Sequence, residues 1–149
     1  MKKLIITNKK LMNINNKKKI IITGSNGYLG SKLSEYFSNL NYEILCIYNK
    51  KKNTIRKKNV THLKLNMLKK IPINRINQKF DAILHFAGPK NHRSYINKNR
   101  NKKKILDGIK IDKNIINFCI KSKIKFFIYA SSSSVYDLNE GIVKKKVIF

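Results

Sequence analysis

The sequence is poor in cysteine and has no long apolar run. Its two cysteines, Cys46 and Cys119, lie far apart inside apolar stretches, which is typical of buried, reduced thiols and not of a disulfide framework or a metal site. No run of apolar residues has the length that a membrane-spanning helix needs. The apolar run after Met1 is interrupted by Asn8 and Lys9 and is too short for a signal peptide. We therefore expect a cytoplasmic protein with neither a metal site nor a membrane anchor.

Acidic side chains are also scarce. The chain of 149 residues has 34 Lys and Arg against 7 Asp and Glu, a formal charge of +27. Such an excess suggests a nucleic acid or an anionic membrane surface as partner. However, the lysines are spread along the whole chain, and they accompany abundant Ile and Asn, as A/T-rich codons would produce. The aromatic residues are not interleaved with them as a stacking platform requires. A basic nucleic-acid-binding protein is therefore only a distant alternative, and we expect no specific nucleic acid and no membrane as partner.

The remaining pattern predicts one domain after a polar leader at residues 1–17. Apolar, partly β-branched segments predict strands at 20–23, 43–48, 60–65, 81–86 and 125–130. Between them, we expect a helix over 28–40 and a second helix that ends near Lys121. Lysine-rich stretches at 49–58 and 97–104 are interpreted as solvated connections. Strands that alternate with helices in this way predict an α/β fold with a parallel sheet covered on both faces.

Helical spacing also suggests which side chains face the core. In the first helix the apolar face comprises Leu29, Leu33, Tyr36, Phe37 and Leu40. In the second, the residues at helical spacing are Ile105, Ile109, Ile116, Cys119 and Ile120. We expect both faces to pack on the sheet.

Three evenly spaced glycines join the first strand to the first helix. Gly24 permits a tight turn off the strand, Gly27 lets the backbone approach a pyrophosphate, and Gly30 lets the helix pack closely on the sheet. The helix N-terminus adds free N–H groups and a partial positive charge, which favour phosphate. This context predicts a Rossmann-type doubly wound sheet of about five strands that binds a dinucleotide.

The glycines and three later segments resemble the extended short-chain dehydrogenase/reductases, the family of nucleotide-sugar epimerases and dehydratases. Residues 23–30 match its Thr-Gly-x-x-Gly-x-x-Gly signature, and residues 81–88 resemble its fourth strand. The stretch 85–90 is especially similar to the form found in UDP-glucose 4-epimerase. Residues 114–119 fit the following helix, and 129–136 resemble the fifth strand with its serine-rich end. The resemblance covers roughly residues 18–137.

The resemblance implies a set of site residues and NAD or NADP as the cofactor. Ser132 would be the catalytic hydroxyl that polarises the substrate, and Lys90 would lie near the cofactor ribose. The expected cofactor-binding residues are Gly24, Gly27, Tyr28, Leu29, Gly30, Asn49, Lys50, Asn66, Met67, Phe86, Ala87, Gly88 and Lys90.

Two of these places depart from the family pattern. NAD-preferring members have an acidic residue after the second strand, where this chain has Asn49 and Lys50. Cations at this place suit a 2′-phosphate and favour NADP, although lysine is abundant throughout the chain. Asn66 replaces an adenine-binding Asp and can still form a hydrogen bond through its amide, with Met67 packing on the ring.

The catalytic Tyr-x-x-x-Lys pair of the family is expected some twenty residues beyond Tyr136, but the sequence ends at Phe149. We therefore interpret the chain as the NAD(P)-binding portion of a nucleotide-sugar epimerase, dehydratase or reductase, truncated before the substrate domain. Residues 18–137 would form the Rossmann domain and 138–149 a short tail. The chain alone would then be inactive, and the edge strand at 126–129 would be exposed. The alternatives are a non-catalytic NAD(P)-binding protein, or one subunit of a split enzyme that forms a dimer or binds a complementing C-terminal chain.

Overall fold

The computed structural model describes residues 17–51, 53–76, 79–89 and 98–131. In chain order, its elements are β1 (Lys19–Thr23), α1 (Tyr28–Asn39), β2 (Glu43–Tyr48), β3 (Val60–Lys64), a short 3-10 turn (Ile73–Arg75), β4 (Ala82–His85), α2 (Lys98–Lys121) and β5 (Phe126–Tyr129). All five predicted strands are present, and their ends lie within one residue of the predicted ones. The leader before residue 17 and the tail at 138–149 lie outside the described residues.

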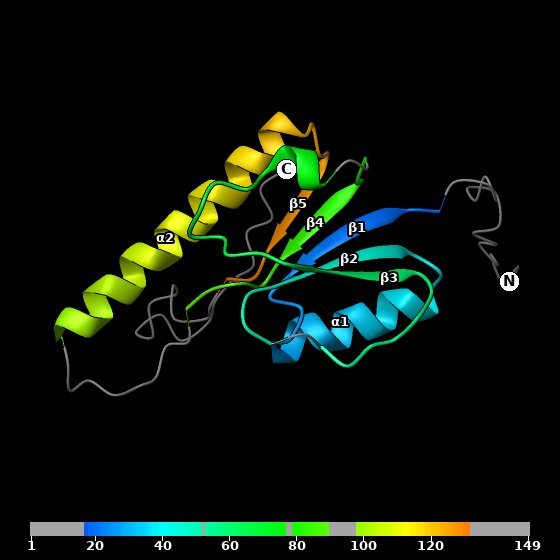
Figure 1. Ribbon diagram of the computed structural model, residues 1–149, viewed down its shortest axis with the longest axis horizontal. Coiled ribbons are helices and arrows are strands. Elements are labelled where there is room, and N and C mark those ends of the chain that lie inside the picture. The colour runs from blue at the N-terminus through cyan, green and yellow to red at the C-terminus, as the bar shows by residue number, and fades with distance from the viewer. Residues whose placement is uncertain (1–16, 52, 77–78, 90–97, 132–149) are drawn as a thin grey trace, which may run out of the picture.

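The five strands form one parallel sheet with the order β3-β2-β1-β4-β5. Helix α1 covers one face of the sheet and α2 the other (Figure 1). The chain runs outward from β1 to β3 and then crosses back to β4, so the direction of winding changes between β1 and β4. This is the doubly wound Rossmann arrangement, and the prediction of the fold is confirmed.

The central strand β1 explains why the sheet needs cover on both sides. Ile21 contributes to the core under α2, whereas Ile20 and Ile22 contribute to the core under α1. All three side chains are at most 3% exposed. Successive side chains of a strand point to opposite faces, so an unbroken β-branched run is the sequence of a strand buried on both faces.

Helix α1 packs on the sheet through small residues and not through the predicted apolar face. Its buried residues are Gly30, Ser34 and Ser38, while Leu29, Tyr36 and Leu40 are exposed. The buried hydroxyls of the two serines donate hydrogen bonds to carbonyls of their own helix, so burial leaves them satisfied. Small side chains let the helix lie close to the sheet, and Leu33 and Phe37 flank this contact, partly buried.

Helix α2 differs from the prediction in two ways. It begins at Lys98, so residues 98–104 are helical and do not form the predicted solvated connection. Lysine is a good helix former, and this end of the helix extends past the strands (Figure 1). Its core-facing residues are Ile115, Phe118 and Cys119. The other four predicted core residues are exposed: Ile105, Ile109, Ile116 and Ile120.

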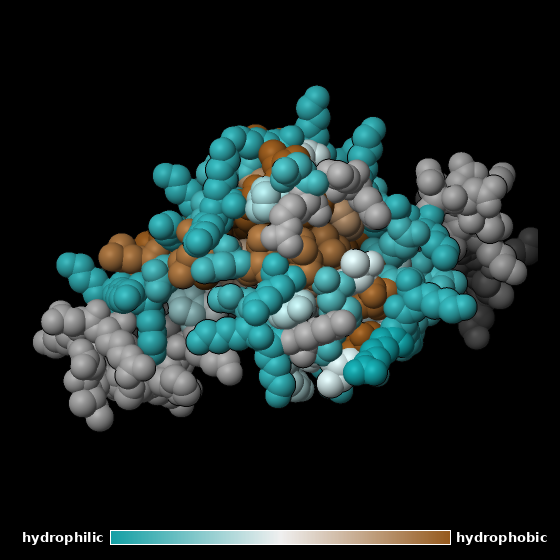
Figure 2. All heavy atoms as spheres, in the orientation of Figure 1, coloured by the Kyte–Doolittle hydropathy of each residue, from teal (hydrophilic) through white to brown (hydrophobic). Residues whose placement is uncertain are grey.

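Strand β5 forms an open edge of the sheet. All four of its side chains are exposed, from 37% for Phe127 to 63% for Phe126. This exposure agrees with the expectation for residues 126–129, and no strand among the described residues pairs with the outer side of β5. Elsewhere, hydrophilic side chains project from most of the face shown in Figure 2, with apolar patches between them.

Candidate functional site

The glycine loop between β1 and α1 has the backbone that such a turn requires. Gly24 adopts a left-handed conformation with φ of 65°, which costs L side chains energy but not glycine. The N–H of Gly27 donates to the carbonyl of Gly24 at 2.9 Å, and α1 begins directly after Gly27. The first N–H groups of α1 have no intrahelical acceptor, so they are available to an anion in front of the helix.

Close approach accounts for two of the three glycines. A Cβ atom on Gly24 would lie 2.6 Å from the carbonyl oxygen of Phe86, and a Cβ on Gly30 would collide with the carbonyl of Gly24. A Cβ on Gly27 would be tight but not prohibitive, at 3.2 Å from the Gly24 oxygen. Gly24 and Gly30 are therefore needed for the fold itself, whereas Gly27 leaves space on the side where a ligand would lie.

A cavity of about 370 Å³ opens at the carboxyl ends of β1, β4 and β5. It lies where the winding of the sheet reverses, which is the place where open α/β sheets bind ligands. Its lining consists of Gly24, Gly27, Tyr28, Leu29, Gly30, His85, Phe86, Ala87, Gly88, Tyr129 and Ala130. The structure thus brings together eight of the predicted cofactor-binding residues, from the glycine loop and from the end of β4.

Four other predicted cofactor-binding residues are described but do not line this cavity. Asn49 and Lys50 are exposed after β2. Asn66 is exposed after β3, and its side-chain oxygen accepts the N–H of Leu68 at 3.1 Å. Met67 is 5% exposed and packs in the core, where it supports the sheet. Their roles toward a cofactor stay predictions.

Two predicted residues, Ser132 and Lys90, lie outside the described residues, and their roles also stay predictions. The neighbouring Ser131 and Ala130 are described and lie directly after β5, at the carboxyl edge of the sheet. Ser131, the first residue of the serine-rich segment, therefore lies at the edge of the sheet where the cavity opens.

The structure adds a polar network that the sequence did not indicate. His85, at the end of β4, is 1% exposed. Its Nδ1 lies 2.6 Å from Oγ1 of Thr23, and its Nε2 lies 3.1 Å from Oδ1 of Asp112 on α2. The hydroxyl of Tyr129 donates to the other oxygen of Asp112 at 3.1 Å. Thr23 and His85 end adjacent strands, which was a usable signal, but nothing in the sequence indicated that Asp112 lies beside them.

Burial and hydrogen bonding determine the protonation of this network. Burial lowers the pKa of His85, against the opposing effect of its hydrogen bond and charge interaction with Asp112. The imidazole is therefore neutral near pH 7. The hydrogen bond to Asp112, with a smaller effect of burial, raises the pKa of Tyr129. Tyr129 is thus a neutral phenol and is unsuited to act as a general base.

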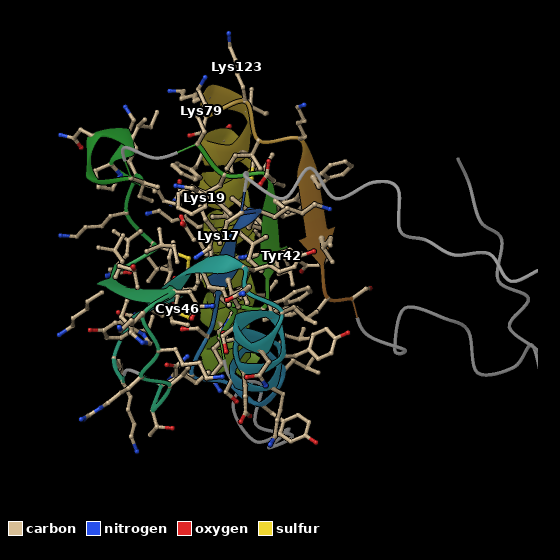
Figure 3. All side chains as sticks on the ribbon, turned by 90° about the vertical axis from the view of Figure 1, so that its right-hand side faces the viewer. Lys17, Lys19, Tyr42, Cys46, Lys79 and Lys123 are labelled. Atoms are coloured by element: carbon tan, nitrogen blue, oxygen red, sulfur yellow. The ribbon has the colours of Figure 1, made fainter. Side chains whose placement is uncertain are left out.

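A second network connects the glycine loop to the segment after β2. The side-chain amide of Asn53 donates to the carbonyl of Ser25 at 3.1 Å, and the hydroxyl of Ser25 donates to the carbonyl of Ile47 at 3.3 Å. Cys46 lies beside them within the sheet (Figure 3). Burial raises the pKa of the Cys46 thiol, and burial raises the pKa of Cys119 to about 11. Both cysteines are free, so the expectation of buried, reduced thiols is confirmed.

A larger hollow of about 680 Å³ lies at the opposite end of the sheet, near the amino ends of β2 and β3. Lys79 and Lys123 project outward from the same end, where β4 and β5 begin (Figure 3). Within the described part of the chain, no three His, Cys, Asp or Glu side chains are grouped as metal ligands would be. Neither helix of that part has the length and apolar character needed to cross a bilayer.

Comparison with known proteins supports this arrangement. Residues 20–147 match the model of the NAD dependent epimerase/dehydratase family. The chain is 30% identical over 130 residues to an ADP-L-glycero-D-manno-heptose-6-epimerase of Brachyspira hyodysenteriae. The matched region covers 82% of this chain and 39% of that protein. The predicted family resemblance is confirmed.

Solved structures agree on the fold. UDP-glucose 4-epimerase of Bifidobacterium longum, in complex with NAD+ and UDP, is 16% identical, with a TM-score of 0.68 over 80% of this chain and 38% of that one. UDP-glucose 4-epimerase of Thermotoga maritima with UDP-glucose is 18% identical, with a TM-score of 0.63 over 76% of this chain and 38% of that one. This chain therefore spans about two fifths of the length of these relatives. The expected cofactor class is confirmed at the level of the family, which is NAD dependent.

Proposed function

Because the chain belongs to the NAD dependent epimerase/dehydratase family, we propose that it is the NAD-binding portion of an epimerase or dehydratase that acts on nucleotide sugars. The observation that carries the proposal is the cavity between β1 and β4, which has the glycine loop on one side and residues 86–88 on the other. A dinucleotide would lie across the carboxyl edge of the sheet at this point.

The described residues divide into two halves of such a site. The N–H groups at the start of α1, beside Gly27, would hold the pyrophosphate, since they combine free donors with the positive end of the helix dipole. Phe86, Ala87 and Gly88 would lie under the nicotinamide half. Bound NAD would supply reversible hydride transfer to and from the sugar. Ser132 would polarise the substrate, and no residue is assigned as the general base.

Binding of NAD to the purified chain tests this proposal. We expect saturable binding at one site in isothermal titration calorimetry. Replacement of Gly27 by alanine should weaken binding by about tenfold or more, which corresponds to about 1.4 kcal/mol, because the added methyl group occupies the space of the pyrophosphate. The substitution should leave the fold intact, since the added atom meets only one backbone oxygen.

Gly108→Ala on α2 is the matched control, because Gly108 does not line the cavity and a Cβ atom there makes only an ordinary contact with Pro89 at 3.5 Å. It should keep the fold and bind NAD more tightly than Gly27→Ala does. A folded wild-type chain with no detectable affinity for NAD would contradict the proposal. Titration with NADP in parallel decides whether Asn49 and Lys50 favour a 2′-phosphate, as predicted from their chemistry.

A second candidate is one subunit of a split enzyme, completed by a chain that pairs with β5. The observation that favours it is the exposure of all four β5 side chains along an open sheet edge, which offers unpaired backbone groups to another strand. This candidate makes the same prediction for NAD and differs in requiring a partner polypeptide for turnover.

A further inference from the structure

Four polar side chains join the wall of the cavity to the middle of α2. Thr23 on β1, His85 on β4, Asp112 on α2 and Tyr129 on β5 are linked in series by three hydrogen bonds. Thr23 and His85 are almost completely buried, at 0% and 1% exposure. Bulk water therefore does not compete for these two side chains, and an unpaired polar group there would be costly.

The direction of each hydrogen bond follows from the donors that are available. The backbone N–H groups of Phe86 and Ala87 both point to Oγ1 of Thr23, at 3.2 and 3.3 Å. The threonine oxygen is thus an acceptor toward both amides, and its own hydrogen is donated to Nδ1 of His85. The hydrogen of the neutral imidazole then lies on Nε2, where it is donated to Oδ1 of Asp112.

We propose that Asp112 is a positioning residue of the cofactor site, which it controls through His85 and Thr23. The carboxylate accepts the hydrogen on Nε2 and so favours the imidazole tautomer that carries its hydrogen there. In this tautomer, Nδ1 accepts the hydrogen of the threonine hydroxyl. The oriented hydroxyl oxygen in turn holds the amides of Phe86 and Ala87, the residues expected under the nicotinamide half of the cofactor. The inference rests on the proposed NAD site.

The packing around the network makes the position of this segment critical. The carbonyl of Phe86 lies so close to Gly24 that a Cβ atom on Gly24 would be 2.6 Å away. The glycine loop and the segment after β4 are therefore in direct contact across the bottom of the cavity. If the hydrogen bonds to Oγ1 of Thr23 were lost, the N–H of Phe86 would keep its bond to the Thr23 carbonyl at 3.3 Å, but Ala87 could shift against the glycine loop and change the shape of the site.

The test compares two substitutions with the same change of charge. Asp112→Asn keeps an acceptor oxygen for His85, and its amide can donate to the hydroxyl oxygen of Tyr129. Asp112→Leu removes the acceptor at similar volume. Affinity for NAD is measured by calorimetry, and the tautomer of His85 is identified from its ring nitrogens by NMR. Asn117→Leu, at an exposed position of α2, controls for the effect of leucine on the helix.

We expect a single Nε2–H tautomer in the wild type and in Asp112→Asn, with NAD dissociation constants within about twofold of each other. Asp112→Leu should lose the tautomer preference and weaken NAD binding by about tenfold, while Asn117→Leu matches the wild type. Equal loss of affinity in Asp112→Asn and Asp112→Leu would overturn the proposal. So would wild-type affinity in an Asp112→Leu protein whose tautomer has changed.

Two further comparisons keep the inference separate from folding and from the proposed function. If Asp112→Leu does not fold, Thr23→Val against Thr23→Ser gives the same comparison, because only serine retains the hydroxyl at the end of the network. If the wild type does not bind NAD, the proposed function fails, and the NMR measurement alone still tests the network. An Nε2–H tautomer that persists in Asp112→Leu would then overturn it.

Discussion

At the scale of the single residue, His85 illustrates how a strand end combines structure and chemistry. Its side chain is buried between β1, α2 and β5, in ring contact with Phe127 and Tyr129, and both ring nitrogens have a partner. Burial and two partnered ring nitrogens are the surroundings of a structural histidine and not of a free acid or base. The histidine nevertheless lines the cavity, so a structural role here is also a role in shaping the site.

The lowered pKa of His85 predicts how stability depends on pH. Burial lowers its pKa in the folded state below the ordinary value of 6.5, so the unfolded chain binds the proton more readily. The stabilising effect of the neutral, buried ring is fully present above pH 6.5. It is lost as the pH falls from there toward the folded-state pKa.

Comparison with His85→Asn measures this contribution. At pH 8 the variant should have a free energy of unfolding that is lower by about 1–3 kcal/mol, because it cannot satisfy the network. The difference from the wild type should narrow as the pH falls below 6.5, as followed by urea unfolding at each pH. A difference that stays constant between pH 8 and 5 would show that His85 does not titrate differently in the two states.

At the scale of the element, helix α2 shows that the sequence alone did not identify the packed face. The helix carries two apolar stripes, and periodicity selected the one that contains Ile105, Ile109, Ile116 and Ile120. The sheet packs against Ile115, Phe118 and Cys119, of which the periodicity had selected only Cys119. Consecutive residues of a helix lie about 100° apart around its axis, so Ile115 and Ile116 point in different directions, and the rotation of α2 on the sheet decides which stripe is buried.

Neighbouring isoleucines give a direct test of this rotation. Ile115 is fully buried, whereas Ile116 is 44% exposed. Ile115→Ala should lower the free energy of unfolding by about 2–5 kcal/mol, the usual cost of a large buried side chain. Ile116→Ala should cost clearly less, because its side chain already contacts solvent. Both are measured by chemical denaturation, and equal losses would contradict the observed orientation of the helix.

At the scale of the whole molecule, the apolar edge strand β5 and a high positive charge set the solution behaviour. Strand β5 exposes aromatic and aliphatic side chains, and such an edge invites pairing between chains. The net charge of +27 opposes association by mutual repulsion. We therefore expect the chain to self-associate more strongly as added salt screens this repulsion.

Substitution at the edge should suppress this association. Phe126→Lys places a charge on an exposed position of β5 and should change the free energy of unfolding by no more than about 0.5 kcal/mol. Light scattering at raised salt should show less association than in the wild type. Asn117→Lys adds the same charge on α2, away from the edge, and should have a smaller effect. Equal effects would indicate that net charge, and not the β5 edge, governs association.

The sequence by itself determined the strands, the parallel α/β fold and the glycine loop, whereas residues 86–88 as cofactor-binding residues came only from the family resemblance. It could do so because local signals carry this information: β-branched runs define buried strands, and Gly24 and Gly30 are required by local backbone geometry and close contact. Only the tertiary structure decided which stripes of α1 and α2 are buried and that Asp112 meets His85. The physical reason is that helix rotation depends on the summed packing of surfaces far apart in the chain. A contact between residues 27 positions apart has no signature in the local sequence.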